Sequence, residues 1–335
     1  MLIGTQYQDM VTAMTILRVV RVATVQATPV ILDAEATVEK AIRLLGEAAD
    51  AGAELVVLPE TFVSLYPSNT WARRAAAFGG SDELWERMWL SSVDVPGPLV
   101  AELAGACRSF GIHAVIGVNE RESERPGTLY NTMLWLGPEG LLHKHRKLMP
   151  THQERLFHGI GRGDDLRAVD TECGRVGGLI CWENRMPLAR YAIYRQGPQI
   201  WVAPTADDSD GWIAHMRAIA IESGAFVISA PQFIPRVAFP EDFPSPLPEQ
   251  EVFGNGGAVI VEPTWGNVVA GPLYGEEGML VYDCDLRQGL HAKRWFDAVG
   301  HYSRDDVLDR PSGAAGENGH ADGSDPAVRL LEKES

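Results

Sequence analysis

Short apolar segments alternate with amphipathic ones along most of this 335-residue chain, and they limit its fold more than any other feature. Val19–Val25 is rich in β-branched residues, which predicts a mostly buried strand. After Asp33, a candidate N-cap, apolar residues within 36–49 recur at the spacing of one helix face. Leu55–Leu58 is a second buried strand, which Pro59 ends. A strand, a helix and a strand in this order form a βαβ unit, so the sequence predicts an α/β fold.

The alternation continues to about residue 309. Further strands are predicted at 113–118, 130–136, 141–143, 176–181, 200–203, 226–229, 257–261 and 279–282, and further helices at 99–110, 187–196 and 212–223. No Gly/Ser-rich linker divides these elements, so we predict one domain over residues 18–309, preceded by an N-terminal extension of residues 1–17. Residues 310–335 are rich in Gly, Asp and Glu with few large apolar residues, which predicts a disordered acidic tail.

The charge balance restricts the class of partner. The net charge is −16 at pH 7, and such a field repels both nucleic acid and anionic membrane surfaces. The dense basic run Lys144–Lys147 is too short to reverse it. The start of the chain lacks a basic n-region, and Arg18 and Arg21 interrupt the apolar run that follows. We therefore expect no signal peptide and no membrane span.

Cysteine and histidine spacing argues against a metal or a disulfide framework. The four cysteines are widely separated and form no Cys-x-x-Cys pair, which favours reduced thiols in the cytoplasm. They are Cys107, Cys173, Cys181 and Cys284. Four histidines lie within residues 143–158, but their spacing matches no compact ligand set and the His-Glu-x-x-His pattern is absent, so no metal site is predicted.

One of the cysteines ends a predicted strand. The apolar run from Val176 reaches Cys181, after which Asn184 is a candidate helix cap and Pro187 falls in the first turn of the next helix. A thiol at such a turn is expected to be exposed at the end of the sheet and close to a positive helix terminus. Both features favour the reactive thiolate. From this stretch alone, a buried structural cysteine is the alternative.

Two charged side chains follow predicted strands in the same way. Glu60 stands just past Leu55–Leu58, and Lys147 just past the strand at 141–143. Catalytic groups of α/β sheets collect at the carboxyl ends of strands, although an acid such as Glu60 beside a proline is, taken alone, more often a solvated loop charge. With Cys181 they supply a base, a cation that lowers the pKa of the thiol, and a nucleophile. Glu154, on spacing alone, is a surface partner for a basic neighbour.

The motifs that hold these residues resemble the three signature regions of the nitrilase superfamily. They are LPETF at Leu58–Phe62, HRKLMPT at His145–Thr151 with Glu154 and Arg155 following, and CWEN at Cys181–Asn184. They occur in order within residues 19–302, nearly the whole predicted domain. The second and third motifs, and the stretch at 301–308, resemble the nitrilase branch more than the amidases or carbamoylases. One departure is the loop at 159–165, GIGRGDD, where nitrilases commonly show a Gly-Gln-Gly-Asp-Gly type of sequence.

The resemblance implies a fold, an activity and a set of roles. The fold is a four-layer α-β-β-α sandwich that forms a homodimer through its outer helices and extends into larger homo-oligomers. By position, Glu60 matches the general base, Lys147 the cation, Cys181 the nucleophile, and Glu154 a second glutamate against the lysine and substrate. The implied reaction is hydrolysis of an organic nitrile to the carboxylic acid and ammonia through a cysteine thioimidate and thioester, without cofactor or metal.

Other activities with the same residues stay open at this point. They are an amidase or carbamoylase, a cyanide dihydratase, and, more distantly, a scaffold without activity. Predicted pocket walls are Thr61–Tyr66, Trp182 and Pro204–Trp212, whose mixture of aromatic and small residues favours aliphatic or arylaliphatic nitriles over hydrogen cyanide. Trp182 alternatively packs inward. The aromatic residues of the loop-rich region 62–78 line the pocket, contact another subunit or pack locally.

Overall fold

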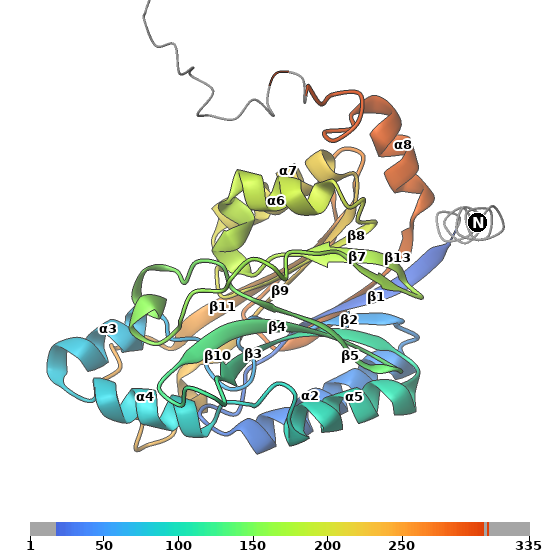
Figure 1. Cartoon of the computed structure of the whole chain (residues 1–335). Helices are drawn as coiled ribbons and strands as arrows, with labels where there is room; N and C mark the ends of the chain where they lie inside the picture. Colours follow the sequence, from blue (N-terminus) through green and yellow to red (C-terminus); the bar gives the residue numbers. More distant parts are fainter. Residues whose placement is uncertain (1–17, 305–306, 308–335) are drawn as a thin grey trace, which may run out of the picture.

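Two stacked β-sheets form the centre of the protein in a computed structural model that describes residues 18–304 and 307 (Figure 1). The predicted extension and acidic tail lie outside these residues, so they and the domain boundaries stay predictions. The first sheet has the strand order β13-β1-β2-β3-β4-β5. Its strands are β1 (Val19–Gln26), β2 (Leu55–Val57), β3 (His113–Arg121), β4 (Leu129–Gly137), β5 (Gly140–Arg146) and β13 (Gly278–Asp285).

The second sheet lies against the first and has the order β10-β11-β9-β8-β7-β6, with β12 also paired to β11. Its strands are β6 (Val169–Thr171), β7 (Gly174–Gly178), β8 (Ile200–Thr205), β9 (Phe226–Pro231), β10 (Phe233–Pro235), β11 (Val252–Val261) and β12 (Val268–Tyr274). Strands β7, β8 and β9 run parallel, as β1, β2 and β3 do in the first sheet. The predicted strands are confirmed, while β6, β10 and β12 were not predicted.

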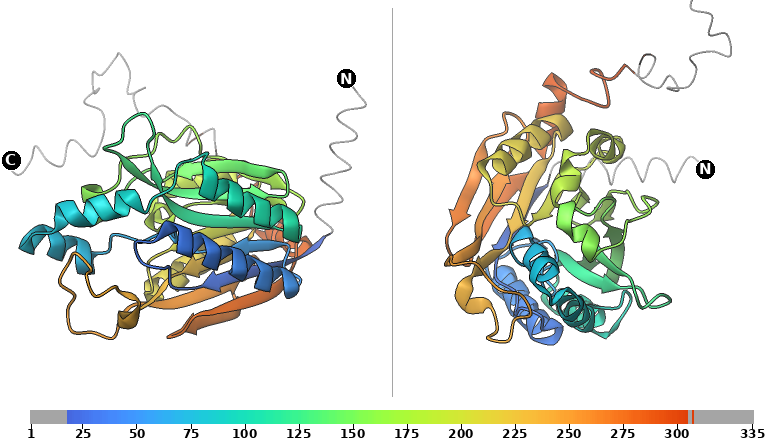
Figure 2. Two further views of the ribbon diagram at one scale, coloured as in Figure 1. Left: turned by 90° about the horizontal axis from the view of Figure 1, so that it is seen from below. Right: turned by 90° about the vertical axis from the view of Figure 1, so that its left-hand side faces the viewer.

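Helices cover the outer face of each sheet and give four layers (Figures 1 and 2). The first sheet carries α2 (Ala34–Asp50) and α5 (Pro98–Phe110), and the second carries α6 (Pro187–Tyr194) and α7 (Asp210–Ser223). Separate apolar clusters fill the space under each helix pair and the space between the sheets. The predicted α-β-β-α sandwich is therefore confirmed. Within the described residues, no helix combines the length and apolar character needed to cross a membrane.

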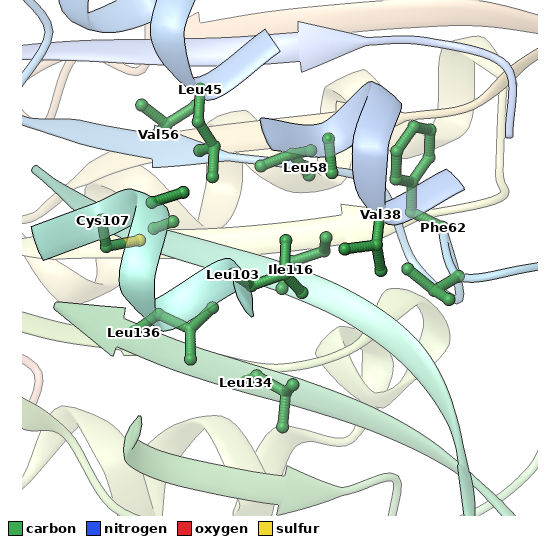
Figure 3. Packing of buried hydrophobic residues seen from close by; sticks show 14 of the residues in the cluster. Val38, Leu45, Val56, Leu58, Phe62, Leu103, Cys107, Ile116, Leu134 and Leu136 are labelled. Carbon is green, nitrogen blue, oxygen red and sulfur yellow. The ribbon is translucent and has the colours of Figure 1, made fainter. Parts of the chain in front are cut away.

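Helix α2 shows how the sequence builds one of these layers. The Asp33 side chain accepts a hydrogen bond from the Ala36 amide and caps the helix as predicted. Val38 and Leu45 lie on the buried face and pack with α5, whose Leu103 contributes to the same cluster (Figure 3). Each such side chain stabilises the fold by roughly 1.5–3 kcal/mol, so this face holds the helix on the sheet.

The prediction of a loop-rich region at residues 62–78 is wrong from residue 69 onward. It forms α3 (Asn69–Phe78), which Ser68 caps, and α4 (Ser81–Leu90) follows; both lie at one end of the sandwich (Figure 1). Trp71 of α3 packs edge-on against three phenylalanines of the 239–253 segment, so packing within the same chain, through residues distant in the sequence, accounts for this aromatic residue. A further helix, α8 (Arg287–Trp295), follows β13.

The stacking brings the carboxyl ends of several parallel strands together. Ala27, just past β1, forms a bridge with Gln232, just past β9. The Gln232 side-chain amide then donates to the carbonyl of Glu60, just past β2, at 2.9 Å. Side chains that follow strands of both sheets therefore meet at one edge of the sandwich, where the candidate site lies.

Candidate active site

Glu60 is a buried carboxylate with one occupied and one free oxygen. Its Oε1 accepts from Lys147 Nζ at 2.7 Å and from Asn131 Nδ2 at 2.7 Å. Its Oε2 is buried and has no hydrogen-bond partner among the described residues. Burial raises the pKa of Glu60 above its ordinary value, although Lys147 opposes this. A carboxylate with a free oxygen and a raised pKa is suited to accept a proton.

Lys147 is fully buried between two carboxylates. Its Nζ lies 2.5 Å from Glu154 Oε2, in addition to the contact with Glu60. Burial alone lowers the pKa of Lys147, but the charges of Glu154 and Glu60 outweigh it and hold the pKa above its ordinary value. The side chain is therefore a fixed ammonium ion.

Glu154 is a saturated anion rather than a surface residue, so the prediction from spacing alone is wrong. Its Oε2 also accepts from the Thr151 amide at 2.7 Å and the Tyr66 hydroxyl at 3.2 Å. Asn131 donates to its Oε1 at 2.9 Å. Although burial opposes ionisation, Lys147 leads the groups that hold the pKa of Glu154 well below its ordinary value. A carboxylate held by this many donors is a poor base.

The glycine-rich loop packs on the backbone of Lys147. The Gly161 amide donates to the Lys147 carbonyl at 2.8 Å. A Cβ atom at Gly161 would lie only 2.1 Å from the carbonyl oxygen of Arg146, so this close approach requires glycine. The loop thus fixes the segment that carries the cation.

Cys181 begins a tight turn and not an α-helix. Strand β7 ends at Gly178, and Cys181 starts a 3₁₀ turn (η2, Cys181–Arg185) with φ 47°, a strained value for a residue other than glycine. Asn184 is not the cap of α6, whose N-cap is Met186. The Asn184 amide instead donates to the Cys181 carbonyl at 2.9 Å and stabilises the turn.

The thiol of Cys181 is buried, which corrects the expectation of an exposed thiol. Only 3% of the residue is exposed. Burial raises the pKa of the thiol well above its ordinary value, Glu60 raises it further, and Lys147 opposes both. The Thr205 hydroxyl donates to Sγ at 3.1 Å. Because the charges of Glu60 and Lys147 both act on the thiol, the structure brings the three predicted residues together.

A second buried network holds the turn from behind. His145 lies between Asp165, at 2.8 Å from Nδ1, and Glu183, at 3.1 Å from Nε2. Burial alone lowers the pKa of His145, but the two carboxylates raise it to about 10. Glu183 in turn accepts from the amides of Ile180 and Leu148, which flank the nucleophile and the cation. Cys181 and Lys147 are thereby tied to one carboxylate.

Comparison with known proteins identifies the family. A family model of carbon-nitrogen hydrolases matches residues 21–293. The chain belongs to this family. It is 45% identical over 292 residues to an aliphatic nitrilase of Sinorhizobium fredii (strain HH103), covering 86% of this chain and 94% of that one. It is 44% identical over 302 residues to Nitrilase 1 of Arabidopsis thaliana, covering 86% and 85%. The resemblance to the nitrilase branch is therefore confirmed.

A solved structure supports the fold of this carbon-nitrogen hydrolase. Saccharomyces cerevisiae Nit3, a member of branch 10 of the nitrilase superfamily, matches with a TM-score of 0.67 over 86% of this chain and 98% of that one. Sequence identity is 20%, so the similarity concerns the fold alone.

The predicted pocket walls differ in how far they are exposed to solvent. Residues 61–66 are buried, and Tyr66 contacts Glu154. Trp182 does not pack inward: it is 45% exposed, and its indole donates to Asp207 at 2.7 Å. Arg185 stacks on the same ring. These contacts place Trp182 at the surface beside the nucleophile.

Sequence reasoning missed Asn131 and the network around His145 in the site of this carbon-nitrogen hydrolase, and it placed Thr205 in the predicted pocket wall Pro204–Trp212 without its hydrogen bond to Cys181. Asn131 lies within β4, and no local pattern separates it from other polar strand residues. Thr205 ends β8, so its position at a strand end was the available signal. Within the described residues, no group of three His, Cys, Asp or Glu side chains is arranged to hold a metal ion. The expected absence of a metal stays a prediction.

Replacing Thr205 by valine is expected to slow alkylation of Cys181 by iodoacetamide. A hydrogen bond to a charged group contributes about 1.5–3 kcal/mol, so loss of the hydroxyl donor lowers the rate by roughly 10- to 100-fold. Thr205→Ser keeps the donor and is the matched control. Peptide mass spectrometry gives the rate at each cysteine. Equal rates for the valine and serine variants would contradict a role of the hydroxyl in stabilising the thiolate.

Proposed function

We propose that this carbon-nitrogen hydrolase converts an organic nitrile to the carboxylic acid and ammonia, with Cys181 as nucleophile, Glu60 as general base and Lys147 as the stabilising cation. The observation that carries the proposal is the buried carboxylate of Glu60, which binds a fixed ammonium ion through one oxygen, keeps the other oxygen free and acts on the pKa of the Cys181 thiol. The names of the two relatives, a nitrilase in each case, favour a nitrile over an amide or a carbamoyl compound.

The first step joins the nitrile to the protein. Sγ of Cys181 attacks the nitrile carbon while Glu60 takes the thiol proton, which removes the cost of a free buried thiolate. The proton then passes to the nitrile nitrogen, and the product is a neutral thioimidate. Lys147 stabilises the negative charge that develops on this nitrogen during the attack.

The next steps use two water molecules. Glu60 deprotonates the first water, which adds to the thioimidate carbon, and the nitrogen leaves as ammonia to give a thioester. A second water, activated in the same way, breaks the C–S bond and releases the carboxylic acid and the Cys181 thiol. Glu154 keeps its charge throughout and holds Lys147 in place, as its saturated hydrogen bonds indicate.

The substrate is proposed to be an aliphatic or arylaliphatic nitrile. Tyr66 and Trp182 lie close to the charged groups and the nucleophile, and such residues suit a medium-sized apolar substituent. Nucleic acid and membranes are not expected partners, since the net charge is −16. The free, unpaired state of all four cysteines supports a cytoplasmic location.

A substrate panel tests the function. It contains an aliphatic nitrile, an arylacetonitrile, a benzonitrile, a dinitrile, cyanide and the amide that matches each organic nitrile, with ammonia release as the readout. We expect organic nitriles to be turned over faster than their amides. Faster turnover of the amides would favour an amidase, and activity confined to cyanide would favour a cyanide dihydratase.

We also expect the chain to form a homodimer and larger homo-oligomers. The outer helices α6 and α7 present exposed apolar residues, including Leu188 and Ile221, that a second copy would cover. Sedimentation at micromolar concentration is expected to give a dimer or a larger species. A monomer at that concentration would contradict this prediction.

A further inference from the structure

His158 is a buried histidine whose two ring nitrogens both face oxygen atoms. Nδ1 lies 3.3 Å from Glu154 Oε1, and Nε2 lies 2.7 Å from Asn119 Oδ1. The Asn119 amide nitrogen donates to the Leu65 carbonyl at 2.9 Å, so its Oδ1 is the acceptor. A neutral imidazole donates through one nitrogen only, and the other would then face an acceptor without a proton. Only the imidazolium satisfies both contacts.

The sum of the charges in the site also indicates that His158 is an imidazolium ion. The side chains of Glu60, Lys147, Glu154 and His158 are all completely buried. Two carboxylates against one ammonium leave an uncompensated negative charge in a region from which water is excluded, and this is costly. A positive charge on His158 brings the sum to zero. If His158 were neutral, the cluster would be neutralised at the lowest free-energy cost by protonation of Glu60, which has the free oxygen and the raised pKa.

We propose that His158 is the second cation of the site and a positioning residue that keeps Glu60 ionised as the base. The positive charge of His158 balances the negative charge of Glu154. The charge of Lys147 then remains to balance that of Glu60. The proposal rests on the proposed function, because Glu60 is the base of that reaction. His158 itself contacts neither Cys181 nor Glu60 among the described hydrogen bonds and acts through Glu154.

The charged and titratable groups around His158 are few. Glu154, on the 3₁₀ turn η1 (His152–Leu156), contacts it directly, and Lys147, Tyr66 and Glu60 are linked to it through Glu154 or Lys147. From β3 and β4 it meets Asn119 and the backbone at Leu129, which are uncharged. The pH dependence that His158 controls is therefore that of the Glu60 base.

The test compares kcat/KM for the best nitrile from pH 5 to pH 10 in the parent chain and in His158→Gln, which keeps an amide donor but carries no charge. His158→Phe removes both donors, and His291→Gln, on the exposed surface of α8, is the control. Loss of the cation is expected to move the acid limb of the profile upward by about one pH unit. This lowers kcat/KM about tenfold below the limb and leaves it within about threefold on the plateau.

An acid limb at the parent's pH in His158→Gln, with kcat/KM lowered equally at every pH, would overturn the proposal and leave a packing role. His158→Gln alone tests the proposal if His158→Phe does not fold. The rate of Cys181 alkylation by iodoacetamide, measured as a function of pH, is expected to show the same acid limb without a nitrile present. The reason is that Glu60 also takes the thiol proton in the alkylation reaction. If the parent turns over no nitrile, the proposed function fails, whereas the alkylation limb still supports or refutes the role of His158.

Discussion

Cys181→Ala is expected to reduce nitrile hydrolysis by at least about 10,000-fold, because the attacking atom is lost and no neighbouring group replaces it. Cys181→Ser keeps the shape of the site but is expected to lose a similar factor. A serine hydroxyl is a far weaker acid than a thiol, and the buried Glu60 has too little driving force to deprotonate it. Steady-state ammonia release by purified variants measures both effects.

The control for this pair is Cys107→Ala. Cys107 is buried in α5 outside the sheets, and burial raises the pKa of its thiol to about 12. We expect its replacement to leave kcat/KM within a factor of about three, with at most a moderate loss of stability from the small cavity. Ammonia release by Cys181→Ala at the parent rate would show that the nucleophile has been misassigned.

Glu60→Gln is expected to lower kcat by about 100- to 10,000-fold, the usual contribution of a positioned general base. The amide keeps the size of the side chain and accepts from Lys147, but it takes no proton. The acid limb of the pH profile is also expected to disappear. Burial raises the pKa of Glu60, so the parent loses its base form, and its activity, as the pH falls through that raised value.

Glu102→Gln is the matched control, since Glu102 is an exposed carboxylate on α5. Its profile is expected to overlay that of the parent. A Glu60→Gln variant that kept the parent's acid limb would show that the limb belongs to another group, and the assignment of Glu60 as base would be wrong.

Patterns along the chain predicted the strands and helices of an α/β fold, whereas the stacking of two sheets into four layers was implied by the resemblance to the nitrilase superfamily. The β-branched run of β1 and the buried face of α2, with Val38 and Leu45 one helix face apart, are visible without coordinates. The error at α3 has a physical reason. Its sequence holds few large apolar residues, and Trp71 is buried by phenylalanines that follow about 170 residues later. Such a distant partner leaves no local signal.

The site was predicted through its motifs, while its electrostatics depend on burial. Glu60, Lys147 and Cys181 were placed at strand ends correctly, but exposure of the thiol was wrong because Cys181 packs in the apolar cluster between the two sheets. Asn131 and His158 reach the cluster from β4 and from the loop after η1. Nothing in their neighbours along the chain indicates that Asn131 donates to Glu60 and Glu154, or that His158 contacts Glu154.

The covalent intermediate provides the most direct test of the central claim. The parent chain is mixed with excess nitrile, stopped with acid during the first turnovers, and examined by intact and peptide mass spectrometry. The account predicts a mass gain equal to the acyl group of the thioester or to the whole nitrile of the thioimidate, located on the peptide that contains Cys181. An adduct on any other residue, or unmodified protein in a sample that has released one equivalent of ammonia in a burst, would contradict it.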